Sequence, residues 1–171
     1  TLVLGPSNIS PNRKNINLIP VTSAKEMYDA VMAFFPKTDI AVLSAAVADF
    51  RPEMVADQKI KKNPENDTFT IKLVKTEDIL KSVGKIKTEN QTVVGFALET
   101  ENGLENAKKK LHTKNIDLIV LNEMNESGVG FKTKTNKISI ITKNDEVTSY
   151  ELKPKNEVAT DILKAIYQYI N

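Results

Sequence analysis

Small, acidic and aromatic residues follow two apolar runs of the sequence. Residues 44–52 read SAAVADFRP, with three alanines in four residues just before Asp49. Residues 95–100 read GFALET, where Gly95 permits close backbone approach and Phe96 offers a ring on which a base could stack. Ligands of open parallel sheets bind beyond the carboxyl ends of the strands, so both segments are candidate binding sites. The alternative is structural: alanines packed against a helix, Asp49 in a turn and Phe96 in the core.

Two groups of lysines could supply positive charge to such a site. Residues 59–62 read KIKK in a polar loop, and a loop of this kind can close over a polyphosphate and neutralise the charge on its leaving group. Residues 108–110 are all lysine, and Lys110 and Lys114 share one face of a predicted helix. Both groups fit phosphate binding, and both equally fit a solvated surface.

The remaining polar signals are weaker. A third apolar run ends at Asn122 and Glu123. The helix start at residues 76–78 offers free backbone N–H groups, although its acids suit sugar hydroxyls better than phosphate. His112 is the single histidine, so a catalytic or metal role for it is not expected. There is no cysteine, no G-x-G-x-x-G segment and no Walker-type loop.

The elements that must position these residues alternate between strand and helix, which predicts an α/β fold. We expect a Rossmann-like, mostly parallel sheet with helices on both faces and a β-hairpin near the C-terminus, forming one domain over residues 1–171. Ser23 and Glu26 form a capping-box pattern at the start of one helix. The predicted strands are 1–4, 17–21, 39–47, 68–74, 92–98 and 117–121; the hairpin is 137–142 with 146–152; the helices are 23–35, 77–86, 102–114 and 156–170.

Composition limits the class of protein. The chain has 171 residues, 40% of them hydrophobic and 27% charged, as in an ordinary globular domain. A net charge of +2 gives no reason to expect binding to nucleic acid or to a membrane surface. No apolar run approaches the roughly 18 residues needed to span a bilayer. We therefore expect a cytoplasmic protein.

Taken in order, these segments resemble the synthetase domain of phosphopantothenoylcysteine synthetases, which in many bacteria follows a flavin-dependent decarboxylase in one bifunctional polypeptide. The resemblance covers essentially the whole chain. Its most specific part is AAVADFRP followed by KIKK. The matching segments are 5–6 (GP), 21–27 (VTSAKEM), 45–52 (AAVADFRP), 59–62 (KIKK), 73–80 (LVKTEDIL), 94–100 (VGFALET), 114–122 (KNIDLIVLN), 130–131 (GF), Asn136 and 155–163.

The resemblance implies a ligase of coenzyme A biosynthesis that joins 4′-phosphopantothenate to L-cysteine. It implies CTP and Mg²⁺ as substrate and cofactor, with ATP favoured by eukaryotic relatives, and an acyl-nucleotide intermediate, here an acyl-cytidylate. It also implies a homodimer, and FMN only where a decarboxylase domain precedes the synthetase.

Carried over residue by residue, the resemblance makes Lys59 the catalytic lysine. Glu77 stands where the family often has proline. No metal ligand is implied at a particular residue. The residues expected to bind the nucleotide are Leu43, Ser44, Ala45, Asp49, Lys59, Glu77, Asp78, Ile79, Leu80, Phe96, Lys110 and Lys114.

The start of the chain departs from the family pattern. The family's glycine-rich first βα unit and the S-N-x-S-S-G segment after it would precede Thr1, and that segment carries an asparagine thought to stabilise the acyl-nucleotide. The chain is therefore expected to be N-terminally truncated, and weak or inactive as an isolated fragment.

Two other classes of function stay open. A nicotinamide-dependent Rossmann oxidoreductase is one, although none of the four tyrosines has a lysine four residues later, as short-chain enzymes require. A non-catalytic dimerisation module that pairs the hairpin edges is the other. The choice between CTP and ATP is also open, because base discrimination depends on loop geometry.

Overall fold

The computed structural model describes every residue except 10, 12, 62–67, 100 and 124–132. Contacts divide the chain into two compact units, one of Thr1–Val31 with Ala46–Asp78 and one of Met32–Ala45 with Ile79–Asn171. Each unit is described by itself below. That residues 1–171 act as one synthetase domain stays a prediction.

The second unit is built on a five-stranded sheet in the order β10-β9-β7-β6-β3. Strands β3 (Ile40–Leu43), β6 (Thr92–Glu99) and β7 (Leu118–Glu123) are parallel. Strands β9 (Ile138–Thr142) and β10 (Val147–Ser149) form an antiparallel hairpin that adds to β7. This mixed sheet confirms the predicted α/β fold with its C-terminal hairpin.

Strand β3 is shorter than predicted. The apolar run continues to Val47, but the strand ends at Leu43, which pairs with Gly95 of β6. Residues 44–48 form no regular structure. A continuous apolar run could not reveal this end, because the end is set by the last residue that has a partner strand.

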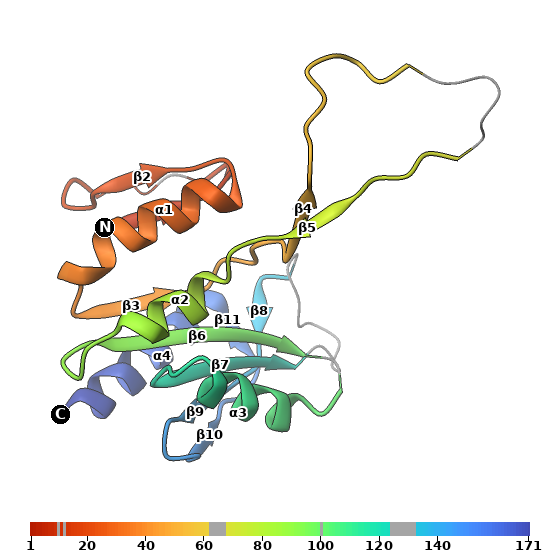
Figure 1. Cartoon of the computed structure of the whole chain (residues 1–171). Helices are drawn as coiled ribbons and strands as arrows, with labels where there is room; N and C mark the ends of the chain where they lie inside the picture. Colours follow the sequence, from red (N-terminus) through yellow and green to blue (C-terminus); the bar gives the residue numbers. More distant parts are fainter. Residues whose placement is uncertain (10, 12, 62–67, 100, 124–132) are drawn as a thin grey trace. The chain divides into compact units, whose positions relative to one another are not determined.

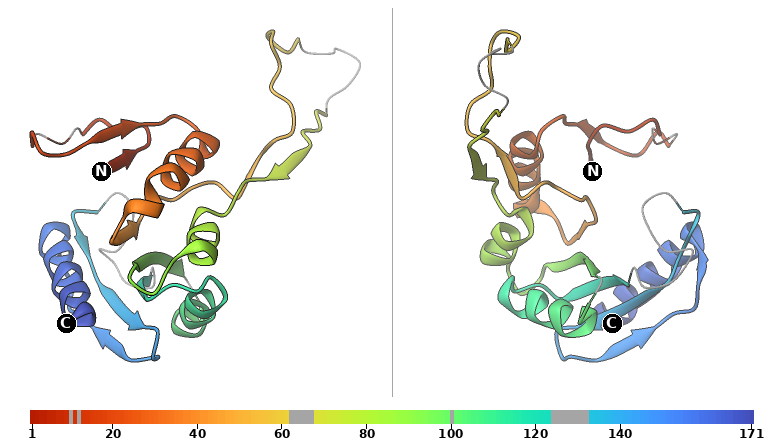
Figure 2. Two further views of the ribbon diagram at one scale, coloured as in Figure 1. Left: turned by 60° about the vertical axis from the view of Figure 1, so that its left-hand side comes forward. Right: turned by 90° about the vertical axis from the view of Figure 1, so that its right-hand side faces the viewer.

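Helices cover both faces of this sheet, as Figures 1 and 2 show. Helices α2 (Ile79–Ile86) and α3 (Gly103–Thr113) lie on one face, and α4 (Lys155–Ile170) lies on the other. A short helix η1 (Phe35–Lys37) leads into β3, and the small pair β8 (Thr135–Asn136) with β11 (Lys153–Pro154) precedes α4. Among the described residues, every helix is too short or too polar to cross a membrane.

The α4 face holds one continuous apolar core. Branched side chains of β6, β7 and β9 interlock with one stripe of the helix, whose members recur every four residues as one face of a helix requires. Burial of these side chains stabilises this half of the unit. The core residues are Val94, Leu118, Val120, Ile138, Ile140, Val158, Ile162 and Ile166, with Phe96, Tyr150 and Ala165 partly buried against them.

Two glycines allow close packing on the α2 face. A Cβ at Gly95 would lie 2.7 Å from Leu80 Cδ2 and 2.8 Å from Ile116 Cδ1, so a larger residue would require these two side chains to shift. A Cβ at Gly84 would lie 1.8 Å from the carbonyl oxygen of Lys114. The Asn115 side chain also donates to the Gly84 carbonyl, at 2.8 Å. The end of α2 is therefore held against the turn between α3 and β7.

A buried ion pair closes the amino edge of the same sheet. The Lys87 ammonium contacts both carboxylate oxygens of Asp117, and their side chains are only 8% and 7% exposed. Oδ2 of Asp117 also accepts the Val93 backbone N–H, at 2.8 Å. The Tyr169 hydroxyl of α4 donates to Oδ1 at 3.5 Å, and burial, followed by the Asp117 charge, raises the pKa of this tyrosine.

The first unit contains a parallel pair of short strands, β1 (Leu2–Leu4) and β2 (Leu18–Pro20). Helix α1 (Ala24–Phe34) follows and belongs to this unit as far as Val31. The predicted capping box is confirmed. Glu26 N–H donates to Ser23 Oγ at 3.2 Å, and the Glu26 carboxylate accepts the backbone N–H groups of Thr22 and Ser23 at 2.6 and 3.3 Å.

In the first unit, β4 (Phe50–Pro52) pairs antiparallel with β5 (Leu73–Lys75). We call the segment between these two strands, residues 53–72, the arm, and the strand pair forms its base (Figure 1). An ion pair of 2.7 Å between Lys72 and Glu53 lies beside this pair of strands. The predicted strand 68–74 is wrong except at Leu73 and Val74, because residues 68–72 form no regular structure. Their alternating pattern belongs to an arm that is exposed over its described residues, 53–61 and 68–72, rather than to a sheet with one covered face.

We expect Lys87→Met to lower the free energy of unfolding by about 3 kcal/mol, because it leaves the Asp117 carboxylate buried without its counter-ion. Urea denaturation measures this. The same substitution at Lys25, whose ion pair with Asp29 is exposed to solvent, is the control and should leave the urea midpoint nearly unchanged. Equal effects of the two substitutions would contradict the importance of burial here.

Gly84→Ala should destabilise the protein by about 2 kcal/mol, because the new Cβ overlaps the Lys114 carbonyl. The sign is informative, since alanine in place of glycine ordinarily stabilises a helix by about 1 kcal/mol. The thermal midpoint measures the effect. Gly5→Ala is the matched control, because its Cβ would meet only Met27 Cε at 3.6 Å. A raised midpoint for Gly84→Ala would show that α2 does not approach the turn this closely.

The capping box predicts a pH dependence of stability. Hydrogen bonds from the Thr22 backbone and side chain lower the pKa of Glu26 below its ordinary value of 4.5. A lowered pKa means that the contribution is complete above pH 4.5 and is lost as the pH falls through the folded-state value. Wild type should therefore exceed Glu26→Gln in unfolding free energy at pH 6, with the difference shrinking towards pH 3. A difference that grows on acidification would contradict this sign.

Candidate functional site

The carboxyl edge of β3 and β6 brings together several predicted nucleotide-binding residues of the second unit. Leu43 pairs with Gly95, and Leu80 of α2 packs on that glycine. Ile79 and Leu80 are themselves buried, so their side chains belong to the core and only their backbone, at the start of α2, is placed to meet a ligand. Ser44 and Ala45 follow β3 and are exposed.

The small size of Gly95 has a structural cause. The close approach that it permits is made by Leu80 and Ile116 of the protein itself. Phe96 points to the opposite face, where it is partly buried against the α4 core. Its predicted role as a stacking surface for a base stays a prediction.

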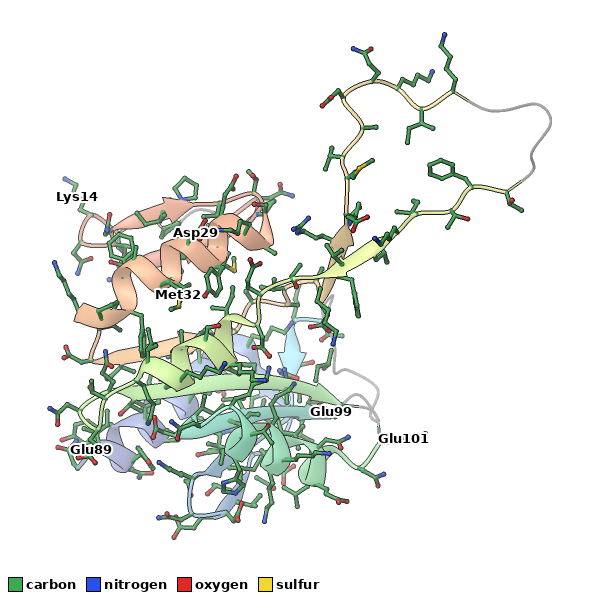
Figure 3. All side chains as sticks on the ribbon, in the orientation of Figure 1. Lys14, Asp29, Met32, Glu89, Glu99 and Glu101 are labelled. Atoms are coloured by element: carbon green, nitrogen blue, oxygen red, sulfur yellow. The ribbon has the colours of Figure 1, made fainter. Side chains whose placement is uncertain are left out.

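The Lys110 side chain reaches Glu99, the last residue of β6. Its ammonium lies 3.8 Å from Glu99 Oε1, and both side chains are partly exposed. Asn106 of the same helix donates to Glu99 Oε2 at 3.3 Å. Figure 3 shows Glu99 at the end of this strand. A loose and partly hydrated pair such as this can release its cation to a phosphate at small cost.

Lys114 has a different place in the unit. It is the residue that ends α3, and its carbonyl rests on Gly84 before the chain enters β7. Its backbone thus lies near the amino edge of the parallel strands, whereas Lys110 reaches Glu99 at the carboxyl edge. Phosphate binding by Lys114 stays a prediction.

In the first unit, Asp49 lies beside the residues that precede α2, at the base of the arm. Thr76 donates its backbone N–H to the Asp49 carbonyl at 2.9 Å and its hydroxyl to the Ala48 carbonyl at 2.5 Å. Glu77 and Asp78 follow directly in sequence. Hydrogen bonds between residues 27 and 28 positions apart in the chain therefore hold three of the predicted nucleotide-binding residues near one another.

The predicted catalytic lysine lies on the arm itself. Lys59 and Lys61 are exposed, and Lys62 lies outside the described residues. Exposed apolar side chains of the arm, including Met54, Val55 and Phe69, accompany them. Lys59 belongs to the first unit and Phe96 to the second, so their meeting around one nucleotide stays a prediction.

The described residues contain no group of three His, Asp or Glu side chains placed to hold a metal ion. Mg²⁺ in nucleotide sites commonly uses one or two carboxylates together with the phosphates of the substrate. Asp49 is exposed near the base of the arm, and binding of magnesium together with a nucleotide stays a prediction.

A pair of asparagines at the end of β7 was not predicted as a site. Asn136 Nδ2 donates to Asn122 Oδ1 at 2.8 Å, and the Lys137 backbone N–H donates to Asn136 Oδ1 at 3.1 Å. Asn122 carried only a weak sequence signal, as the polar end of a strand. Asn136 reaches it through the pairing of β9 with β7, which no local pattern reveals.

The short strand that carries Asn136 is anchored from α4. Lys153 of β11 pairs with Asn136 in register, and its ammonium lies 2.6 Å from Asp161 Oδ2 and 5.5 Å from the Tyr150 ring centre. The hydrogen bond to Asp161 raises the pKa of Lys153, and burial raises the pKa of Tyr150.

Comparison with known proteins gives relatives along the whole chain. A cysteine/cysteine sulfinic acid decarboxylase from an unknown prokaryotic organism is 47% identical over 171 residues, which are 100% of this chain and 47% of that protein. The coenzyme A biosynthesis bifunctional protein CoaBC of Vibrio vulnificus is 41% identical over 166 residues, 97% of this chain and 41% of its own length. The chain thus spans less than half the length of these curated relatives.

Among solved structures, the C-terminal domain of a coenzyme A biosynthesis bifunctional protein CoaBC is 36% identical, with a TM-score of 0.76 over 97% of this chain and 73% of that one. The family model described as the DNA/pantothenate metabolism flavoprotein C-terminal domain matches residues 1–170. This match includes the carboxyl ends of β3 and β6, the arm that carries Lys59, and the β9–β10 hairpin. The chain belongs to that family.

Proposed function

We propose that this chain carries the synthetase activity of a phosphopantothenate–cysteine ligase in coenzyme A biosynthesis. The observation that supports it most is the family match over residues 1–170, which takes in the β3 and β6 ends and the lysine arm together. The relatives named CoaBC are bifunctional proteins of coenzyme A biosynthesis, and the solved CoaBC domain with this fold is a C-terminal one.

The proposed reaction has two steps. A carboxylate oxygen of 4′-phosphopantothenate attacks the α-phosphorus of CTP, and the bond to pyrophosphate breaks. The cysteine amine then attacks the acyl carbon, loses a proton, and displaces CMP. Both steps develop negative charge on phosphate oxygens, which lysines can stabilise.

The arm and the strand edge have separate roles in this proposal. Lys59 is exposed on the arm, so its ammonium is available to a triphosphate. Lys72 of the same arm is instead held in an ion pair with Glu53. Backbone groups of residues 43–45 and of the start of α2 would line the nucleotide. Lys110 would exchange Glu99 for a phosphate, and magnesium would neutralise further phosphate charge.

The wider assignments are part of the same proposal. A decarboxylase domain in the same polypeptide, with FMN, fits the bifunctional relatives and their greater length. A homodimer is proposed from the resemblance to the synthetase family, and a cytoplasmic location is proposed with it. CTP, rather than ATP, is proposed from the resemblance to bacterial synthetases.

A second candidate function comes from the relative named a cysteine/cysteine sulfinic acid decarboxylase. The two activities differ in their products. The ligase consumes a nucleoside triphosphate and releases pyrophosphate, whereas decarboxylation of cysteine releases carbon dioxide without nucleotide. Pyrophosphate formation that depends on both phosphopantothenate and CTP would favour the ligase, and nucleotide-independent carbon dioxide release would favour the alternative.

Replacing Lys59 by alanine in the complete polypeptide should lower kcat for ligation by about 100-fold or more, because a phosphate-binding cation is lost in the transition state. Pyrophosphate release measures the rate, and circular dichroism checks the fold. Lys72→Ala is the matched control on the same arm and should keep near-normal kcat, since Lys72 already pairs with Glu53. Unchanged kcat in Lys59→Ala would reject its catalytic role.

A further inference from the structure

Glu99 places a negative charge at the edge of the sheet where the proposed reaction needs a polyanion to bind. It is the last residue of β6, as Figure 3 shows, and alternation along the strand puts it on the same face as Gly95, which α2 covers. Its side chain is only 22% exposed, so water screens its charge in part. A carboxylate beside phosphates is unfavourable, so this acid should have a task that the phosphates do not explain.

Both recorded partners of the Glu99 side chain come from α3, and they hold it differently. Asn106 and Lys110 are four residues apart, so they share one face of the helix. Asn106 Nδ2 donates to Glu99 Oε2 at 3.3 Å and also to the Glu101 carbonyl at 3.2 Å, which orients the amide. The Lys110 ammonium is 3.8 Å from Oε1, beyond the length of a hydrogen bond. The amide therefore keeps the carboxylate in place if the lysine leaves.

The exchange proposed for Lys110 changes the charge of this site. A phosphate carries at least as much negative charge as a carboxylate and offers more acceptor oxygens, so it can draw the ammonium away from Glu99. Glu99 then keeps its charge and its bond to Asn106, while Oε1 loses its cation. Nucleotide binding thus creates an anionic site that was neutralised before.

The third substrate of the proposed ligase has the chemistry that such a site binds. The α-amino group of cysteine is mostly an ammonium near neutral pH, and it must come close to the acyl phosphate before it reacts. The carboxylate of cysteine is repelled by the phosphates, so an anion is needed to hold its amino end. A carboxylate can do this and can also accept the proton that the nitrogen loses as it attacks.

We propose that Glu99 binds the amino group of cysteine after the nucleotide has taken Lys110, and that Asn106 is the positioning residue that orients the Glu99 carboxylate. The inference rests on the proposed ligase function. In the second step the amine nitrogen forms a bond to the acyl carbon, and Glu99 accepts the proton that the nitrogen loses. The bond between the acyl carbon and the phosphate oxygen breaks, and its electron pair leaves with CMP.

The test follows the two half-reactions separately in the complete polypeptide. Glu99→Gln removes the charge and keeps the size of the side chain. Pyrophosphate release from CTP and phosphopantothenate without cysteine should stay within about twofold of wild type, since only a loose ion pair is lost. KM for cysteine should rise about tenfold, because a hydrogen bond to a charged group is lost. An anchor for Lys110 alone would instead change KM for CTP and leave that for cysteine unaltered.

Hydroxylamine provides a second readout, because it attacks activated acyl groups but is mostly uncharged at neutral pH. Its capture of the acyl-cytidylate as a hydroxamate should therefore be equally fast in wild type and in Glu99→Gln. Loss of reaction with cysteine alone is the expected signature of a site for an ammonium. Equal losses with both amines would place the defect in the acyl-nucleotide and overturn the inference.

Asn106→Leu tests the positioning role without changing Glu99. KM for cysteine should rise about threefold, because the carboxylate loses the hydrogen bond that orients it, while pyrophosphate release stays near normal. Glu105→Gln, the same substitution as at Glu99 but at an exposed position in the first turn of α3, is the control and should change neither half-reaction.

An unchanged KM for cysteine in Glu99→Gln, or a rise confined to CTP, would also overturn the inference. Should Glu99→Gln fail to fold by circular dichroism, Asn106→Leu carries the same comparison of cysteine with hydroxylamine. A wild-type protein that forms no pyrophosphate from CTP and phosphopantothenate would instead reject the proposed function, and this inference with it.

Discussion

The carboxylate of Asp117 is the group on which the order of the second unit depends. It accepts the Val93 backbone N–H and holds the Lys87 ammonium, while its own backbone bonds to Val93 and Lys143 at 3.0 and 2.8 Å. One residue thereby joins β6, β7, the end of α2 and the loop after β9. Because a parallel ladder keeps its register along its length, this fixed amino edge also determines which residues stand at the carboxyl edge, including Glu99 and Asn122.

The candidate binding residues of the two units differ in how they are held. The carboxyl edge of the sheet stands on a closely packed base, where Gly95 admits Leu80 and Ile116, and it presents backbone groups and short polar side chains in set positions. The arm that carries Lys59 is exposed and has few packing partners in its own unit. The proposed ligase reaction would use both, because activation of a carboxylate needs exact positioning of the reacting atoms and also a cation that binds the phosphates.

Much of the fold could be predicted from local patterns. A few neighbouring residues were enough to predict several elements. These are the apolar strands β6 and β7, helix α4 with its four-residue spacing of Val158, Ile162 and Ile166, and the Ser23–Glu26 capping box. The prediction was wrong where a pattern had two physical explanations. Alternation over residues 68–74 looked like a half-covered strand but belongs to the exposed arm, and the apolar run after Leu43 outlasts the partner that would make it a strand.

The sequence by itself determined the α/β class and supplied the candidate strand ends and the candidate phosphate-binding lysines, because these depend on residue type and short spacing. Only the tertiary structure decided that Gly95 serves packing and that Ile79 and Leu80 can offer a ligand little beyond their backbone. It placed the Lys110 side chain beside Glu99 and the Lys114 carbonyl against Gly84. It also brought Asn136 to Asn122. Contacts of this kind join residues distant in the chain, and they follow from how helices and strands pack rather than from any local signal.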